Sequence, residues 1–464
     1  MNDLKSEEER SKPVTVVQKS SWALGSVADV YMTNALNYLA HPIYNMGLGV
    51  DPRMLGWALG LPRIWDAISD PLMGHISDNT RSRCGRRKPY IFLGAILCMI
   101  MFVAIWNPPR NLSVEALGWY FLIATFLYYT VYTIFLVPWA ALGMELTTDY
   151  HERTSVQAFK TVFQAIGGLG LGTMWLLAQK WGDGDDVVGV GYVGWVFGAF
   201  ILICGLASAI FCKEPKSGIA HEKMAFWPSI KSTFSNRVFL ILVSATIFLM
   251  LGIFMVNSFS KYINVYYVYG GNKEGVAKLD MYANFAFQGA GFALIPVITA
   301  LSRRIGKKTT LILGLCTVSM AYGTSWFCYT PEYPYLQLLT LALAAPGLSC
   351  MWILTSAMMA DICDMDELKT GRRREGMFGA SYSWACKVGI SITMIMSGYM
   401  LQWSGFDAAI EVQSEAVITN MRLLYMIVPV VFVGVAALLV SLYPLTEAKV
   451  KEIQAQLKLK ALQN

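Results

Sequence analysis

Charged residues are scarce in this sequence, and that scarcity sets its class. Only 15% of the 464 residues are charged, whereas 55% are hydrophobic. An average soluble protein carries about 25% charged residues, and a single soluble core does not enclose this many apolar runs. The composition therefore excludes an ordinary soluble protein and predicts an integral membrane protein.

Metal-ligand spacings, cysteine pairs and catalytic motifs are also lacking. The four histidines show no HExxH spacing, and the nine cysteines include no CxxC pair. Cysteines inside apolar runs act as small hydrophobic residues, so neither a disulfide framework nor a zinc site is predicted. With no nucleophile–base pair, we expect neither an enzyme nor a cofactor. The polar segment 1–21 has no apolar region beside a cleavage site, so no secretory signal is predicted.

Long apolar runs are abundant instead. A helix needs about 20 mainly apolar residues to span a bilayer. Twelve spans are predicted, and an even number places both termini on one side. They lie near 22–47, 54–78, 89–107, 117–143, 156–179, 190–212, 237–258, 281–302, 308–327, 335–360, 377–402 and 420–443. The first of them is unusually polar.

The charges of the loops predict the orientation. Basic residues gather after the second, sixth, eighth and tenth spans, at 81–88, 213–223, 302–308 and 369–374. The loops on the other side, such as 182–186 and 330–335, are acidic or nearly neutral. By the positive-inside rule, both termini are cytoplasmic in a plasma or inner membrane. The net charge of +6 thus comes from loops that determine topology. Because these basic residues do not form a binding surface, no nucleic-acid partner is expected.

The chain also contains two copies of one plan. The run Arg83–Gly94 after the second span resembles Arg304–Gly314 after the eighth, and Met144-Glu145 parallels Met359-Ala-Asp361. Repeated six-helix halves are the major facilitator plan, with solute bound near the midplane. We predict an all-α membrane protein with two pseudo-symmetric bundles of six transmembrane helices. The predicted parts are a tail at 1–21, bundles at 22–212 and 237–443, a cytoplasmic linker at 213–236 and a tail at 444–464.

Two carboxylates in the second predicted span indicate a cation site. Asp66 and Asp70 are one helical turn apart on the same face. Because close carboxylates repel, one takes up a proton or both hold a cation. Oxygen ligands suit Na⁺, a hard cation, and protonation suits H⁺. The alternative is that Arg63, one turn before Asp66, neutralises that carboxylate as a structural pair.

Polar side chains in the first and fourth spans indicate a solute site. Asp29, Thr33, Asn37 and His41 follow at intervals of four and form one slanting polar stripe. A carboxylate accepts hydrogen bonds from neighbouring sugar hydroxyls, so we assign Asp29 to solute binding. The alternative for this stripe is hydrogen bonding between helices. Tyr132 offers an aromatic face with a hydroxyl tip, which suits a sugar ring, although packing explains a single tyrosine equally well.

The fifth and eleventh spans each carry a lysine. Lys387 lies about ten residues into its span, too deep to reach the surface easily, and predicts a carboxylate partner among the aspartates above. The residues Tyr382, Ser383 and Trp384 accompany it as solute-binding candidates. Lys160 is another candidate, although it lies nearer the membrane surface. The eighth span, the counterpart of the second, has only Asn284 and Gln288, which places the ion site in the first half.

Charged residues in the cytoplasmic loops are candidates for gating. They are Asp78, Arg81, Arg83 and Arg86 in the first half and Asp361, Asp364, Arg372 and Arg373 in the second. Ties between these two groups would hold an outward-facing state. For any one of them, a solvated role in topology is an equally good interpretation.

One stretch carries a family resemblance. RIWDAISDPLMGHISDNTRSRCGRRKP at 63–89 resembles the signature of the glycoside–pentoside–hexuronide:cation symporter family, part of the major facilitator superfamily. The likeness continues at 133–146, 152–160 and 361–389.

The resemblance assigns roles to several residues. It implies that Asp66, Asp70 and Thr133 bind the cation. It also implies that the solute-site aspartate, the span 5 basic residue and the span 11 lysine fall on Asp29, Lys160 and Lys387.

Two positions depart from the family pattern. Leu136 replaces a second sugar-binding aspartate of the melibiose carrier, and Ser69 replaces an asparagine of the sodium-using pattern. The identity of the sugar and the choice between H⁺ and Na⁺ are therefore open.

The predicted function is secondary active transport. We expect symport of a sugar or glycoside with H⁺ or Na⁺ by alternating access. The expected partners are this solute and the lipid bilayer, and the sequence indicates no obligate protein partner. One alternative is a cation-coupled carrier of a lysolipid or sulfonate. Another is a non-transporting sensor or a channel, although no pore-lining filter is seen.

Overall fold

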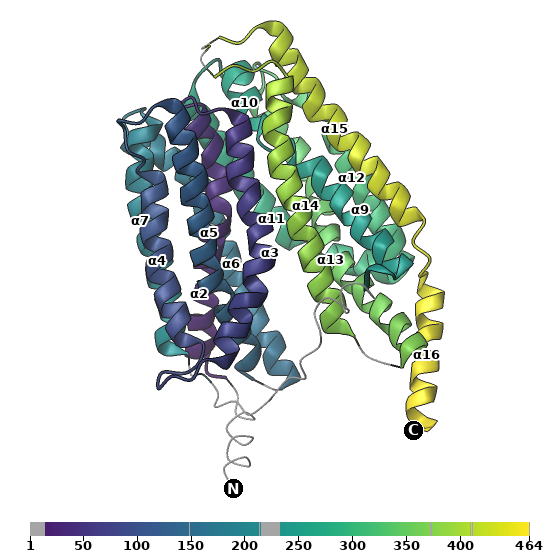
Figure 1. Cartoon of the computed structure of the whole chain (residues 1–464). Coiled ribbons are helices and arrows are strands. Elements are labelled where there is room, and N and C mark those ends of the chain that lie inside the picture. The colour runs from purple at the N-terminus through teal and green to yellow at the C-terminus, as the bar shows by residue number, and fades with distance from the viewer. Residues whose placement is uncertain are drawn as a thin grey trace. The chain divides into compact units, whose positions relative to one another are not determined.

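The computed structural model consists of helices and short connections (Figure 1). It describes residues 14–147, 149–212, 214, 233–371, 374–408, 410 and 412–463, and no strand occurs within them. The helices are α2 (Val16–Ala40), α3 (Pro52–Asn79), α4 (Lys88–Trp106), α5 (Val114–Glu145), α6 (Tyr150–Trp181), α7 (Asp186–Phe211), α9 (Arg237–Phe254), α10 (Phe259–Ile263), α11 (Lys273–Ile305), α12 (Lys307–Cys328), α13 (Gln337–Thr370), α14 (Glu375–Trp403), α15 (Glu415–Ser441) and α16 (Glu447–Gln463). The π-helical segments η1 (His41–Asn45) and η2 (Asn264–Val268) and the 3₁₀ turn η3 (Pro334–Leu336) complete the elements.

Length and hydropathy identify the membrane-spanning helices. In the described part of the chain, 10 helices are long and apolar enough to cross a bilayer. The helices α2 and α3, which correspond to the first and second predicted spans, are not among them. Both carry many polar side chains, and α3 contains three ionisable residues near its middle, Arg63, Asp66 and Asp70. The twelve predicted spans are consistent with this arrangement, in which α2 and α3 are the polar members.

The chain divides into two compact units. Unit 1 contains Met1–His221 with Lys273–Phe285 and Asp407–Glu411, and unit 2 contains Glu222–Asn272, Ala286–Phe406 and Val412–Asn464. The beginning of α11 thus belongs to unit 1 and the rest of that helix to unit 2. Most of the predicted linker at 213–236 lies outside the described residues. The predicted domain boundaries stay predictions.

Within unit 1, two tryptophans join α2 to α5. The Trp22 indole donates a hydrogen bond to the Trp139 carbonyl, the Trp139 indole donates one to the Trp22 carbonyl, and both are 3.0 Å long. The rings stack with centroids 5.2 Å apart. Each ring lies over a glycine of the other helix, Trp139 over Gly25 and Trp22 over Gly143, so a side chain at either glycine would collide with an indole. These contacts satisfy buried polar groups where helix backbones approach closely.

The other helices of unit 1 pack around this pair. α2 also packs against α6 and α7, α3 packs against α5, and α4 packs against α5 and α7, and Figure 1 shows α4 and α7 side by side. Gly94 of α4 faces the backbone of Phe135 in α5, where a Cβ atom would lie 2.7 Å from the Phe135 nitrogen. Small residues at such crossings let membrane helices approach one another without voids.

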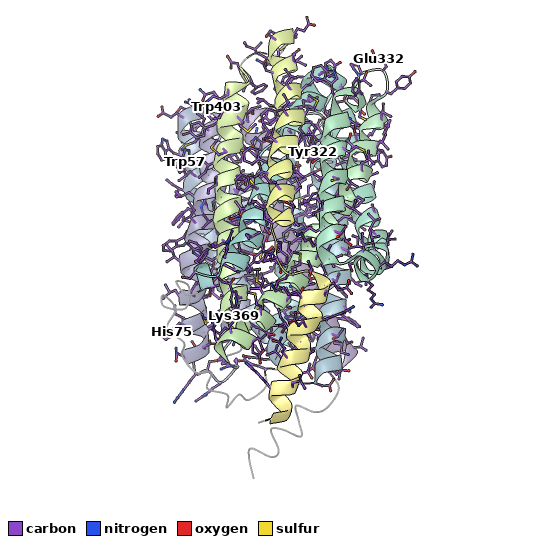
Figure 2. All side chains as sticks on the ribbon, turned by 90° about the vertical axis from the view of Figure 1, so that its right-hand side faces the viewer. Trp57, His75, Tyr322, Glu332, Lys369 and Trp403 are labelled. Atoms are coloured by element: carbon purple, nitrogen blue, oxygen red, sulfur yellow. The ribbon has the colours of Figure 1, made fainter. Side chains whose placement is uncertain are left out.

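Several of these helix pairings recur in unit 2. α12 packs against α13 and α15, and α9 packs against α14 and α15. Glu332 and Trp403 lie at one end of the unit and Lys369 at the other (Figure 2). The segment predicted as a C-terminal tail contains α16, which packs against α13. Ile453 of α16 is buried, and Gln454 donates a hydrogen bond of 3.1 Å to the Asp364 carboxylate.

Both halves of the sequence also begin with a helix that ends in a π-helical turn. In η1, Asn45 donates a buried hydrogen bond of 2.7 Å to the Val50 carbonyl. In η2, Asn264 and Gln337 exchange two side-chain hydrogen bonds of 2.9 and 3.0 Å. A buried asparagine therefore stands at each of the two π-helical turns.

Candidate cation and solute site

The helix α3 presents Asp66 and Asp70 to α5. Asp51 caps the start of α3 and Pro52 occupies its first position, a placement that suits proline because its missing N–H has no partner there. Asp66 is only 1% exposed. The Thr133 hydroxyl of α5 donates to Asp70 Oδ1 at 3.0 Å and lies 3.5 Å from Asp66 Oδ1. The three predicted cation-binding residues therefore lie together.

Ser69 completes this group of oxygen atoms. Its hydroxyl is 3.2 Å from the Thr133 hydroxyl, and its side chain is buried. The sequence indicated Ser69 only as a departure from a family pattern. Two carboxylates and two hydroxyls thus gather on one side of α3, the ligand set that suits a hard cation or a shared proton. We call Asp66, Ser69, Asp70 and Thr133 the oxygen cluster.

Arg63 contacts Asp66 from the other side. Its Nη1 is 3.6 Å from Asp66 Oδ2, and its Nη2 donates to the Thr33 carbonyl at 3.4 Å. The guanidinium lies over the Tyr129 ring, 4.3 Å from its centroid. The structural pair considered as the alternative is therefore present. It uses Oδ2 of Asp66, whereas Oδ1 faces Thr133.

Asp29 forms a second polar group with α5. The Tyr132 hydroxyl donates to Asp29 Oδ1 at 2.7 Å, and the Thr33 hydroxyl lies 3.2 Å from the same oxygen and 3.0 Å from the Tyr132 hydroxyl. We call Asp29, Thr33 and Tyr132 the Asp29 group. Because Arg63 contacts the Thr33 carbonyl, a continuous chain of polar contacts joins this group to the oxygen cluster.

Lys160 approaches the same region from α6. Its ammonium lies 5.3 Å from the centroid of the Trp139 ring, a cation–π distance. The backbone carbonyl of Lys160 accepts a hydrogen bond from Ser26 of α2, which fixes the position of α6 against α2.

The remaining solute-site candidates lie on α14 in unit 2. Tyr382 donates a hydrogen bond of 3.3 Å to Thr355, and the Trp384 ring meets Phe234 edge to face. Ser383 is exposed. The carbonyl of Lys387 accepts a hydrogen bond from Ser391. The charge network predicted between Lys387 and the aspartates of unit 1 stays a prediction.

The gating candidates of unit 1 take part in a network at the end of α3. Arg86 contacts Glu145 at 2.6 Å and Glu214 at 3.7 Å. The buried Arg87 contacts Asp78 at 2.8 Å and Glu145 at 2.6 Å. Burial alone would lower the pKa of Arg87, but its hydrogen bond to Glu145 and the nearby carboxylates outweigh burial and raise that pKa.

The network and the list of gating candidates overlap only in part. Arg81 and Arg83 are exposed. The sequence analysis did not single out Arg87, although it adjoins Arg86 in a basic run. For Glu145, the parallel between Met144-Glu145 and Met359-Ala-Asp361 was the feature that could have identified it.

The gating candidates of unit 2 also have partners in their own unit. Lys307 contacts both oxygens of Asp361, at 2.7 and 2.8 Å, and Asp364 accepts from Gln454. Arg374 pairs with Asp366. Arg372 and Arg373 lie outside the described residues. A tie between the two groups of gating residues stays a prediction.

The sequence matches one family over nearly its whole length. Residues 21–447 match the family described as MFS/sugar transport protein. The chain belongs to this family. This transporter is 25% identical to the Glucuronide carrier protein homolog of Escherichia coli (strain K12) over 452 residues, which cover 95% of the chain and 96% of the relative. It is 21% identical over 448 residues to the Sodium-dependent lysophosphatidylcholine symporter 1 of Xenopus tropicalis, covering 86% of the chain and 81% of the relative.

Solved structures share the fold of this transporter. A bacterial homolog of the human lysosomal transporter Spinster, in an inward-facing and occupied conformation, superposes with a TM-score of 0.68 at 16% identity. The match covers 93% of this chain and 97% of that one. The predicted all-α major facilitator fold and the family resemblance are confirmed. The family also confirms that the chain is a transporter and not an enzyme.

Proposed function

We propose that this transporter is a symporter that carries a sugar or glycoside together with H⁺ or Na⁺ by alternating access. The observation that carries the proposal is the oxygen cluster buried among the apolar helices of unit 1. An ionisable side chain costs at least about 2.5 kcal/mol in the middle of a membrane. The two carboxylates of the cluster, with Arg63 one turn before Asp66, are therefore expected to serve a function. Relatives named as a glucuronide carrier and a sodium-dependent symporter support this use.

The cation is the first part of the proposal. It binds at Asp66 and Asp70, with the hydroxyls of Thr133 and Ser69 beside them. A bound cation or proton reduces the negative charge of Asp66 and so weakens its attraction for Arg63. Arg63 also contacts the Thr33 carbonyl, and a change at the oxygen cluster therefore reaches the Asp29 group. Cation and solute then raise each other's affinity by the same factor.

The solute is the second part. Asp29 Oδ1 already accepts from Tyr132 and Thr33, and these hydroxyls orient the carboxylate for the hydroxyls of a polyol. The Tyr132 hydroxyl holds this carboxylate, and the Lys160 ammonium lies nearby over the Trp139 ring. In this proposal Tyr382, Ser383, Trp384 and Lys387 contribute from unit 2.

Topology and gating form the third part. We place this transporter in the plasma or inner membrane of the cell, with both termini in the cytoplasm. The reason for this orientation is that the basic loops 81–88 and 369–374 follow even-numbered spans. The charged residues of these loops then lie on the inner side. Ties among them would stabilise the state that is closed to the cytoplasm.

A non-sugar solute is the second candidate. A relative named as a lysophosphatidylcholine symporter matches most of the chain. Leu136 adds to this case, because it gives α5 an apolar side chain one turn after Tyr132. A lysolipid or a sulfonate with the same coupling is therefore the alternative.

Uptake into vesicles tests the function. Purified transporter is reconstituted and given a Na⁺ gradient, a pH gradient or neither, with a neutral glycoside, a hexuronide or lysophosphatidylcholine as the solute. We expect one solute class to accumulate above its outside concentration under one ion gradient and only to equilibrate without it. Equilibration of every solute regardless of the gradient would contradict symport and favour a channel.

A further inference from the structure

The helix α11 takes part in both units. Its residues Lys273–Phe285 belong to unit 1, and the residues from Ala286 onward belong to unit 2. Two contacts within unit 1 hold the first part of α11. One is ionic and lies at the helix start, and the other is a hydrogen bond about three turns later.

The ionic contact pairs Lys273 with Asp186. The Lys273 ammonium is 3.1 Å from Asp186 Oδ2, and the Asp186 side chain is 1% exposed whereas that of Lys273 is 30% exposed. Asp186 is the first residue of α7, where the helix dipole favours a negative charge. A buried carboxylate that loses its cationic partner is strongly destabilised. The contact therefore favours the state in which α11 rests on α7.

The second contact places Asn284 against glycines of α6. The Asn284 amide donates to the Gly168 carbonyl at 2.7 Å. A Cβ atom on Gly172 would lie 2.5 Å from the Asn284 amide nitrogen, so only glycine admits this side chain there. The Tyr38 hydroxyl donates to the Gly172 carbonyl at 3.2 Å and extends the polar contact to α2.

Exposed aromatic residues mark the membrane surface near this contact. Trp181, Tyr192 and Trp195 are between 40% and 56% exposed at the end of α6 and the start of α7. Tryptophan and tyrosine gather where lipid meets water. The Asp186–Lys273 pair thus lies near a boundary of the membrane, and in the proposed topology that boundary faces the outside.

We propose that the Asp186–Lys273 ion pair and the Asn284–Gly168 hydrogen bond form an outer latch that must open whenever the solute site faces the outside. This inference rests on the proposed alternating access and on cytoplasmic termini. The two contacts share one consequence. Removing either of them favours the outward-open state without touching the oxygen cluster or the Asp29 group.

A cysteine on α2 reports opening directly. Asn37→Cys places a thiol on the polar stripe, two turns outward of Asp29 in the proposed topology. Cells that express this variant are treated with a membrane-impermeant maleimide, and the labelling rate is compared with that of the chain carrying only its own cysteines. Labelling needs neither solute nor ion gradient, so this readout is separate from uptake.

Three latch variants and one control are added to the Asn37→Cys chain. Lys273→Met removes the cation, and the double variant Asp186→Asn with Lys273→Met removes both charges and so avoids leaving a buried charge unpaired. Asn284→Ala removes the hydrogen bond. Gln288→Ala, one turn later on α11, is the matched control.

We expect each latch variant to raise the labelling rate about threefold to tenfold, as the loss of a single contact shifts a two-state equilibrium, and the control to leave it unchanged. Rates within about twofold of the parent for both the double variant and Asn284→Ala would overturn the latch. If labelling rises but no solute ever accumulates under a gradient, the proposed symport fails while the latch stands. If solute accumulates while labelling stays unchanged, the latch fails and the proposed symport stands.

Discussion

The two units use the same arrangement of cation and carboxylate but with different numbers of partners. In unit 1, Gly85 with φ 104° precedes Arg86, and in unit 2, Gly306 with φ 84° precedes Lys307. Arg86 contacts Glu145 at the end of α5, and Lys307 contacts Asp361 in α13. The echoes noted in the sequence therefore correspond to equivalent contacts.

The two units differ more in their charged residues than in the packing of their helices. Arg86 and Arg87 have Asp78, Glu145 and Glu214 around them, whereas Lys308 contacts the backbone carbonyls of Ser441 and Tyr443. The difference is larger inside the membrane. The middle of α3 carries Arg63, Asp66 and Asp70, while the middle of its counterpart α11 has the uncharged Asn284 and Gln288. The two halves thus share packing contacts, and they differ in the ionisable residues at the middle of these helices.

The largest effect is expected where the halves differ most. Asp66→Asn keeps the shape of the side chain but removes its charge, so cation binding should fail and concentrative uptake should fall about 100-fold, near the upper range of site-to-site coupling. The measurement is solute accumulation in vesicles under the effective ion gradient. Gln288→Asn in the counterpart helix is the control and should leave uptake unchanged. Full accumulation by Asp66→Asn would exclude Asp66 as the coupling residue.

The second prediction compares the glycines at equivalent helix crossings. A Cβ atom on Gly94 would lie 2.7 to 2.8 Å from the Phe135 nitrogen and Cα, whereas one on Gly314 would lie 3.0 to 3.2 Å from Cys350 and Gly347. Gly94→Ala should therefore destabilise the protein by about 2–3 kcal/mol and Gly314→Ala by about 1 kcal/mol. Thermal unfolding in detergent measures both.

Gly434→Ala serves as the control for these glycines, because no atom of the described residues lies within 4 Å of a Cβ atom there. Its unfolding temperature should match that of the parent. A larger drop in unfolding temperature for Gly314→Ala than for Gly94→Ala would contradict the prediction.

The third prediction compares the contacts of Arg87 in unit 1 with those of Lys307 in unit 2. Glu145→Gln leaves the buried Arg87 with fewer partners and should cost about 1–2 kcal/mol of stability. Asp361→Asn removes the charged partner of Lys307, whose side chain is 39% exposed and can turn to water. The loss of stability in this variant should therefore stay below about 1 kcal/mol. Because the pKa of Arg87 is raised, its charge persists at neutral pH and the ordering should not depend on small pH changes. Denaturant titration measures both variants, and a reversed ordering would refute this interpretation of the two networks.

The smallest effect concerns the start of the charged helix α3. Hydrogen bonding from the Arg53 side chain, which outweighs partial burial, lowers the pKa of Asp51. A lowered pKa in the folded state stabilises the protein above the unfolded value of about 3.9, and this stabilisation is lost as the pH falls through the folded value. Since asparagine is as good a helix cap as aspartate, Asp51→Asn should lose less than about 1 kcal/mol at neutral pH. At pH about 3, where the carboxylate gains protons, the difference should shrink, and a difference that grows in acid would contradict the assignment.

Apolar length predicted most of the spans, and helical spacing predicted that Asp66 and Asp70 share one face of α3. Only the family resemblance implied that Thr133 of α5 joins these two aspartates. Periodicity says nothing about which side chain of a neighbouring helix fills a gap, so the roles of Ser69 and Arg87 were missed. The division of α11 between the units depends on tertiary packing and leaves no pattern along the chain.

The paired tryptophans of α2 and α5 have an optical consequence. Trp22 and Trp139 stack at 5.2 Å with their planes 19° apart, close enough for their electronic transitions to couple. Such coupled chromophores give a two-lobed signal in circular dichroism that vanishes when the rings separate. The molecule thus carries its own spectroscopic marker at the crossing of α2 and α5, readable without any attached dye.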